Sequence, residues 1–173
     1  MDAPIDRATL VRERLERLAE ERGDITAEVL ERYYAAQPDA RQSFERHGLS
    51  DIAGLEARMV SETVYLLLRW VEEPGAVKID QATTIVHHND TLDIGPRWYM
   101  GLVDAVIDIL LEAAVDRPDE RAAWRAIRSE IARFIDSLRP EFLHTIDTQP
   151  LVSPDRLAPI RNRSQRSVWN SGL

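Results

Sequence analysis

Apolar residues recur every three or four positions along most of this chain, and polar residues fill the positions between them. This period matches one face of an α-helix, whereas no segment shows the alternation or the hairpin turns that indicate β-strands. The pattern predicts helices over residues 6–22, from Thr26 up to Pro38, in a short stretch ending near Phe44, and over 51–72, 79–89, 97–115 and from 117–120 onward. We therefore expect an all-α fold of about seven helices.

Glycine and proline mark the boundaries of these helices. Gly23 is expected to end the first helix and Thr26 to cap the second. Pro38 stops the second helix, and the Glu-Glu-Pro-Gly stretch at 72–75 ends the long central one. These breaks leave one compact domain, which we place at residues 1–149.

The residues from Pro150 onward have a different composition. They include three prolines, four arginines and the single Trp169, with few residues typical of a core. We expect an irregular, flexible tail over 150–173, which is either a solvated C-terminus or a peptide that docks on a partner through arginine and tryptophan.

Composition narrows the chemistry. The chain has no cysteine, which rules out disulfides, thiolate metal sites and cysteine nucleophiles. Its formal net charge of −8 argues against nucleic-acid binding, which needs a basic surface. No apolar run approaches the roughly 18 residues of a membrane span, and the charged N-terminus lacks the apolar core of a signal peptide. We expect a soluble cytoplasmic protein without a membrane partner.

Two adjacent histidines, His87 and His88, precede a Gly95-Pro96 turn. Neighbouring residues on a helix point about 100° apart, so the two imidazoles cannot both face one small ligand. In an ordinary helix one histidine would be packed and hydrogen-bonded, and the other exposed.

Other histidine chemistry finds little support. A phosphohydrolase of the His-Asp type would need further histidines, and only His47 and His144 remain. The Glu141–His144 spacing is that of a di-iron bundle, but it occurs once and Pro140 interrupts its helix. No phosphate loop or nucleophile elbow is present.

The surroundings of the histidine pair resemble the sensor globins of bacterial globin-coupled sensors. Residues 95–101, Gly-Pro-Arg-Trp-Tyr-Met-Gly, look like the Pro-[Lys/Arg]-Trp-Tyr-Met-Gly signature that opens the G helix of that group. Residues 33–34 are similar to the aromatic–Tyr pair of the B helix, and Pro38 followed by Phe44 has the spacing of the C-helix proline and haem-stacking phenylalanine. Ala-Ala-Trp at 122–124 is similar to the start of many bacterial H helices, so the resemblance covers about residues 8–140.

The resemblance implies a globin-like fold with an extra N-terminal helix around a b-type haem. His88 would be the iron ligand, with His87 as second choice, and Tyr99 would orient the imidazole through a hydrogen bond. Tyr34 would donate a hydrogen bond to bound O2, or Tyr33 if the helix is rotated. The pocket wall would be Phe44, Met59, Thr63, Leu67, Val103 and Val106.

Two departures from the family pattern keep an alternative open. In sensor globins the iron-binding histidine usually lies seven residues before the signature proline, where this chain has Asn89; His88 fits if the turn carries one extra residue. The Tyr-to-Pro distance near Pro38 is also about one turn short. The alternative is a haem-free sensory globin that binds a lipid or an anion and acts through protein–protein association.

The function that the resemblance implies is binding of a diatomic gas (O2, CO or NO), as a sensor or input subunit with a separate transmitter protein. Sensor globins usually form homodimers through their last two long helices. We expect the acidic line Asp104, Asp108 and Glu112 to be solvated, and we expect the dimer surface at Leu102, Ile109 and Leu111. No flavin or nicotinamide domain is apparent, so sustained turnover as an enzyme would need an outside reductase.

Overall fold

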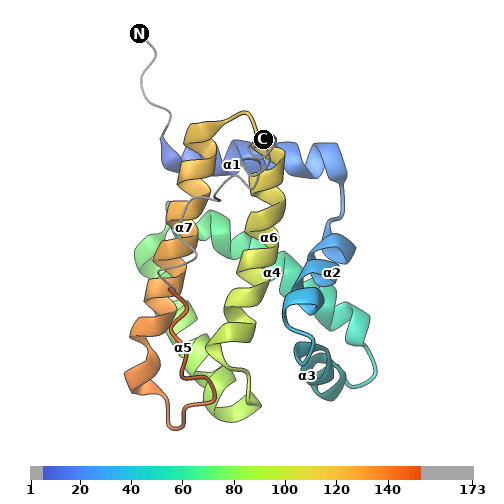
Figure 1. Ribbon diagram of the computed structural model, residues 1–173, viewed down its shortest axis with the longest axis vertical. Helices are drawn as coiled ribbons and strands as arrows, with labels where there is room; N and C mark the ends of the chain where they lie inside the picture. The colour runs from blue at the N-terminus through green and yellow to red at the C-terminus, as the bar shows by residue number, and fades with distance from the viewer. Residues whose placement is uncertain (1–5, 153–173) are drawn as a thin grey trace, which may run out of the picture.

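The computed structural model describes residues 6–152, which form seven α-helices and a final 3-10 turn, with no strand among them (Figure 1). The elements are α1 (Arg7–Arg22), α2 (Thr26–Ala36), α3 (Ala40–His47), α4 (Ile52–Glu72), α5 (Pro74–Leu92), α6 (Pro96–Ala113), α7 (Pro118–Ser137) and η1 (Arg139–Glu141). The prediction of an all-α fold of about seven helices is confirmed. Within the described residues, no helix is both long and apolar enough to cross a membrane.

The predicted boundaries of α3 and α5 were wrong, and α5 also ends at Leu92 instead of residue 89. α3 continues to His47, about one turn beyond the expected end near Phe44. α5 begins at Pro74 and not at residue 79. The reason lies in Pro74, which occupies the first helical turn, where a missing N–H leaves no hydrogen bond unmade. Glu73 alone, with φ −134° and ψ 54°, separates α4 from α5.

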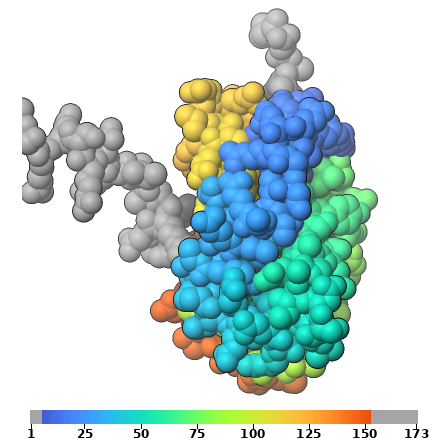
Figure 2. All heavy atoms as spheres, turned by 90° about the vertical axis from the view of Figure 1, so that its right-hand side faces the viewer, coloured from blue at the N-terminus to red at the C-terminus, as the bar shows by residue number. Residues whose placement is uncertain are grey.

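α6 is the central helix of the fold. It packs most extensively against α2 and α7 and also contacts α4. In Figure 1, α6 and α7 lie side by side along the long axis, with α1 crossing one end. α1 to α4 form most of the face that Figure 2 shows. Val106, Ile107 and Leu110 of α6 are fully buried, and burial of such a side chain contributes about 1.5–3 kcal/mol.

This packing contradicts two of the three residues predicted for the dimer surface, while the third, Leu111, is half-buried. Ile109 is fully buried in the core of its own chain and Leu102 is 9 % exposed, so neither offers a free surface. The acidic line is also on α6. Its Asp104 pairs with Arg128 and its Glu112 pairs with Arg32.

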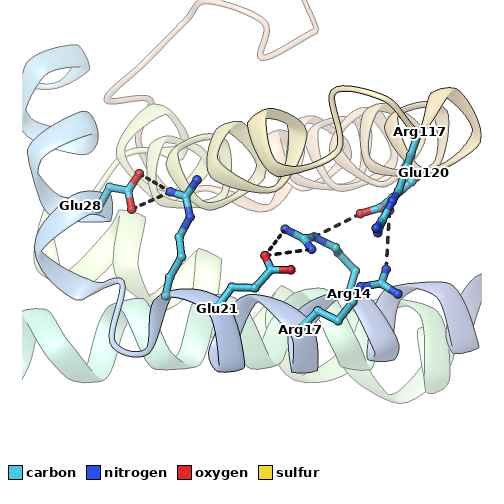
Figure 3. A network of polar contacts seen from close by, with 7 residues as sticks. Arg14, Arg17, Glu21, Glu28, Arg117 and Glu120 are labelled. Atoms are coloured by element: carbon cyan, nitrogen blue, oxygen red, sulfur yellow. Dashed lines mark hydrogen bonds and ion pairs between the residues drawn. The ribbon is translucent and has the colours of Figure 1, made fainter.

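A buried ion pair joins α1 to α7. Arg14, 1 % exposed, lies with Nε 3.3 Å from Oε1 of Glu120, which is 4 % exposed. Figure 3 shows Arg17 and Arg117 converging on the same carboxylate, and Glu21 on the Arg14 guanidinium. Charges taken out of water need such partners, so this cluster constrains how the N-terminal helix sits on α7.

The segment after η1, residues 142–152, contacts the end of α5, and we call it the C-terminal strap. The Asn89 amide donates to the carbonyl of His144 at 2.8 Å, and Asp90 accepts from the backbone N–H of Leu143 at 3.0 Å. Asp136 of α7 accepts from the backbone N–H of Leu151 at 3.0 Å. The predicted tail, 150–173, lies outside the described residues except for its first three.

Candidate ligand-binding cavity

A cavity of about 400 Å³ opens between α2, α3, α4, α5 and α6. This volume falls within the range of roughly 300–1,000 Å³ that is usual for small-molecule and cofactor sites. Most of its surface is apolar, with contributions from Phe44, Leu55, Met59, Leu66, Trp98 and Leu102. A few polar side chains interrupt this lining, and their placement decides what the cavity can hold.

His88 lines the cavity and has a defined tautomer. Its Nδ1 lies 2.7 Å from the carbonyl oxygen of Thr84, one turn earlier on α5. A carbonyl oxygen only accepts hydrogen bonds, so Nδ1 carries the proton and Nε2 presents a lone pair. Burial lowers the pKa of His88 below its usual 6.5, which keeps the ring neutral near pH 7. A neutral imidazole with a free Nε2 is the form that binds metals.

The two neighbours of His88 face elsewhere. His87 is exposed and is not part of the lining. Asn89 is fully buried, and its side chain contacts the C-terminal strap instead of the cavity. α5 ends at Asp93, whose φ of 55° is left-handed, and the N–H of Ile94 returns to the carbonyl of His88 at 2.9 Å.

Of the two tyrosines on α2, Tyr33 lines the cavity and Tyr34 does not. Tyr33 is 2 % exposed, while the Tyr34 hydroxyl donates to Glu56 at 2.5 Å. Gly101 permits this arrangement, because a Cβ atom at that position would lie 2.8 Å from the Tyr33 ring. Burial raises the pKa of both phenols, so they remain hydrogen-bond donors at neutral pH.

Tyr99 lines the cavity beside His88, with ring centroids 6.1 Å apart and an edge-to-face angle of 80°. Its hydroxyl donates to Gln81 and not to the imidazole. Tyr99 therefore holds the orientation of His88 by ring packing, and the carbonyl of Thr84 provides the hydrogen bond that was expected from Tyr99.

Of the six residues predicted for the pocket wall, three line the cavity and three lie in the core. Phe44, Met59 and Thr63 line the cavity, and Thr63 satisfies its hydroxyl by donating to the carbonyl of Met59 at 2.8 Å. Leu67 and Val106 are fully buried and Val103 is 1 % exposed, but all three lie outside the lining.

Sequence reasoning missed several lining residues, among them His47, Arg58 and Trp98. His47 stands three residues after Phe44, which places both on one side of a helix, and this spacing is the signal that could have found it. Arg58 is exposed at the cavity and has no ion-pair partner among residues 6–152.

Within the described part of the chain, no three histidine, aspartate or glutamate side chains group closely enough to hold a metal ion by themselves. Comparisons with protein-family models, with curated proteins and with solved structures each gave no significant match.

Proposed function

We propose that this chain is a globin-like protein whose cavity binds a b-type haem through Nε2 of His88, and that it binds O2, CO or NO as a sensor or input subunit. The observation that carries the proposal is His88 itself. Its Nδ1–H is held by Thr84, and its Nε2 is left without a hydrogen bond among the described residues at the wall of an apolar cavity. A hydrogen bond at Nδ1 orients an iron-binding histidine and raises its basicity.

The lining fits the chemistry of a haem. A porphyrin has flat apolar faces and two carboxylates, and the cavity offers apolar side chains together with the cationic Arg58, which lies one helical turn from the carboxylate of Glu62 in the same lining. Phe44 and Trp98 provide aromatic surface for such faces. In this setting Arg58 would pair with a haem carboxylate.

The order of the helices supports the globin-like part of the proposal. His88 lies near the end of α5, and Pro96 opens α6 after a short turn, as the resemblance implies. Phe44 lies on α3 and lines the same cavity from another side. The left-handed Asp93 supplies the longer turn that His88 needs.

When bound, a haem held by His88 would supply the iron chemistry that takes up a diatomic gas. The chain would contribute three functions around it. His88 would hold the group, the apolar wall would exclude water, and the Tyr33 hydroxyl would donate a hydrogen bond to charge on a bound gas. Tyr33 takes this part in place of Tyr34, whose hydroxyl is committed to Glu56.

The test is an absorption spectrum of the full chain titrated with hemin, then reduced and exposed to CO. We expect a saturable Soret band that shifts with CO and is lost in His88→Ala. His87→Ala removes an exposed imidazole from the same helix and is the matched control, which should keep the band. A band that survives in His88→Ala would contradict the proposal.

One observation favours a second candidate, a haem-free sensory globin that binds a lipid carboxylate and signals by association with a partner protein. An unpaired arginine beside an apolar cavity is also suited to a fatty acid. If hemin does not bind, a fluorescent fatty acid should bind at about one per chain and weaken in Arg58→Gln. His88→Ala should leave that binding unchanged.

A further inference from the structure

Two imidazoles line the same cavity in the same chemical form. Nδ1 of His47 lies 2.8 Å from the carbonyl oxygen of Ser43, one turn earlier on α3, just as His88 bonds to Thr84. In each ring Nδ1 therefore carries a proton, and in a neutral ring Nε2 presents a lone pair. No hydrogen bond to either Nε2 is present among residues 6–152.

Other polar groups of the lining leave these lone pairs unused. Thr63 donates to the carbonyl of its own helix, and the Tyr99 hydroxyl donates to Gln81. Neither Nε2 is among the buried atoms that lack a partner, so both nitrogens are accessible and available to a ligand that enters the cavity.

The two histidines approach from separate helices. α3 and α5 both pack against α4, and Met59 and Thr63 of α4 lie in the lining along with them. Figure 1 draws α3 and α5 apart from each other, with the lower end of α6 between them. Imidazoles on separate helices can reach the two faces of one flat macrocycle, which neighbouring histidines on one helix cannot do.

We infer that His47 is a second protein ligand that would hold the haem iron together with His88, so that a gas would have to compete with His47 for the iron. This inference rests on the proposed function. It concerns the ligand opposite His88 and adds a step of competition within the chain to gas binding.

The surroundings explain why His47 is the exchangeable ligand of the two. His47 is the last residue of α3, followed by Gly48 and by Leu49, which is 86 % exposed with φ 49°. His88 lies one turn inside α5, and its carbonyl also takes part in the turn that ends the helix. Release of His47 would require movement only at the end of a short helix.

The test uses the full chain reconstituted with hemin, studied by absorption and by electron paramagnetic resonance. Two imidazole ligands give low-spin ferric haem, so we expect a low-spin signal in the parent chain and a high-spin signal in His47→Ala. Because CO can bind only the fraction with an open site, its apparent association should speed up on the order of tenfold in His47→Ala.

The controls separate this inference from the proposed function. His144→Ala removes an exposed histidine outside the lining and should keep the low-spin signal. A high-spin parent chain, or a His47→Ala variant that stays low-spin, would overturn the role of His47 and leave haem binding by His88 intact. Absence of any Soret band in the parent chain would overturn both. Circular dichroism of the apo variant establishes that it is folded, and His47→Gln provides a second variant without an iron-binding imidazole.

Discussion

At the residue scale, the protonation of His88 links the cavity to pH. Burial lowers the pKa of His88 in the folded chain below its usual 6.5, and exposure on unfolding restores it. Just below about pH 6.5, His88 is therefore protonated in the unfolded state while it stays neutral in the folded state. Stability contributed by the neutral His88 is fully present above that pH and is lost as the pH falls toward the lowered pKa.

This difference predicts a measurable pH dependence of the apo chain. The free energy of unfolding of the parent chain, minus that of His88→Gln, should fall between about pH 7.5 and about pH 5.5, with a slope of up to roughly 1.4 kcal/mol per pH unit. Urea denaturation at several pH values measures it. His87→Gln, which removes an exposed imidazole from the same helix, is the matched control. A difference that stays constant across this range would show that burial does not hold the ring neutral.

At the scale of elements, the Arg14–Glu120 pair connects α1 with α7 through charges that water does not reach. Removing the Glu120 carboxylate leaves the Arg14 guanidinium buried. Its only remaining partner in the part of the chain that the structure describes is then Glu21, through two long contacts of 3.4 Å. Glu120→Ala should therefore lower the free energy of unfolding by about 3–5 kcal/mol. Thermal or urea denaturation provides the measurement.

Two further variants distinguish this effect from general damage. Arg22→Ala removes a pair with Glu28 in which both side chains are about one-third exposed, and it should cost only about 0–1 kcal/mol. The double variant Arg14→Met with Glu120→Leu replaces the buried charges by apolar groups of similar size and should recover most of the loss. A small effect of Glu120→Ala would mean that water reaches the pair.

The helices were largely predictable from the sequence because their apolar periodicity is a local property. α1 and α4 ended where Gly23 and the Glu-Glu-Pro-Gly stretch indicated. The start of α5 was not predicted because the Glu-Glu-Pro-Gly stretch marks the end of the preceding helix, whereas Pro74 is also compatible with the first turn of the next one. Helix existence followed from the pattern, and the exact ends depended on local backbone geometry.

The cavity was predictable only in part, because helical phase depends on tertiary packing. The choice between Tyr33 and Tyr34 depends on a rotation of about 100°, which a sequence pattern does not determine. The close approach of Gly101 to the Tyr33 ring decides it in the structure. The spacing of His47 from Phe44 places both on one side of α3, but no local pattern predicts that this side and α5 line one cavity.

At the scale of the whole molecule, a ligand that binds only the folded chain stabilises all of it. Hemin at a free concentration of 100 times its Kd should add about 2.7 kcal/mol. For a domain of this size, that corresponds to a rise in Tm of roughly 5–10 °C. Differential scanning calorimetry with and without hemin measures it, and His88→Ala should show no specific rise. An equal rise in both chains would indicate binding outside the cavity.

Asn89 and His88 are consecutive residues, yet one belongs to the C-terminal strap and the other to the cavity. A helix turns as one body, so no rotation of α5 can reposition the imidazole without also moving the amide that holds the carbonyl of His144. A rotation of α5 in response to a ligand at His88 would therefore also move the C-terminal strap that Asn89 holds.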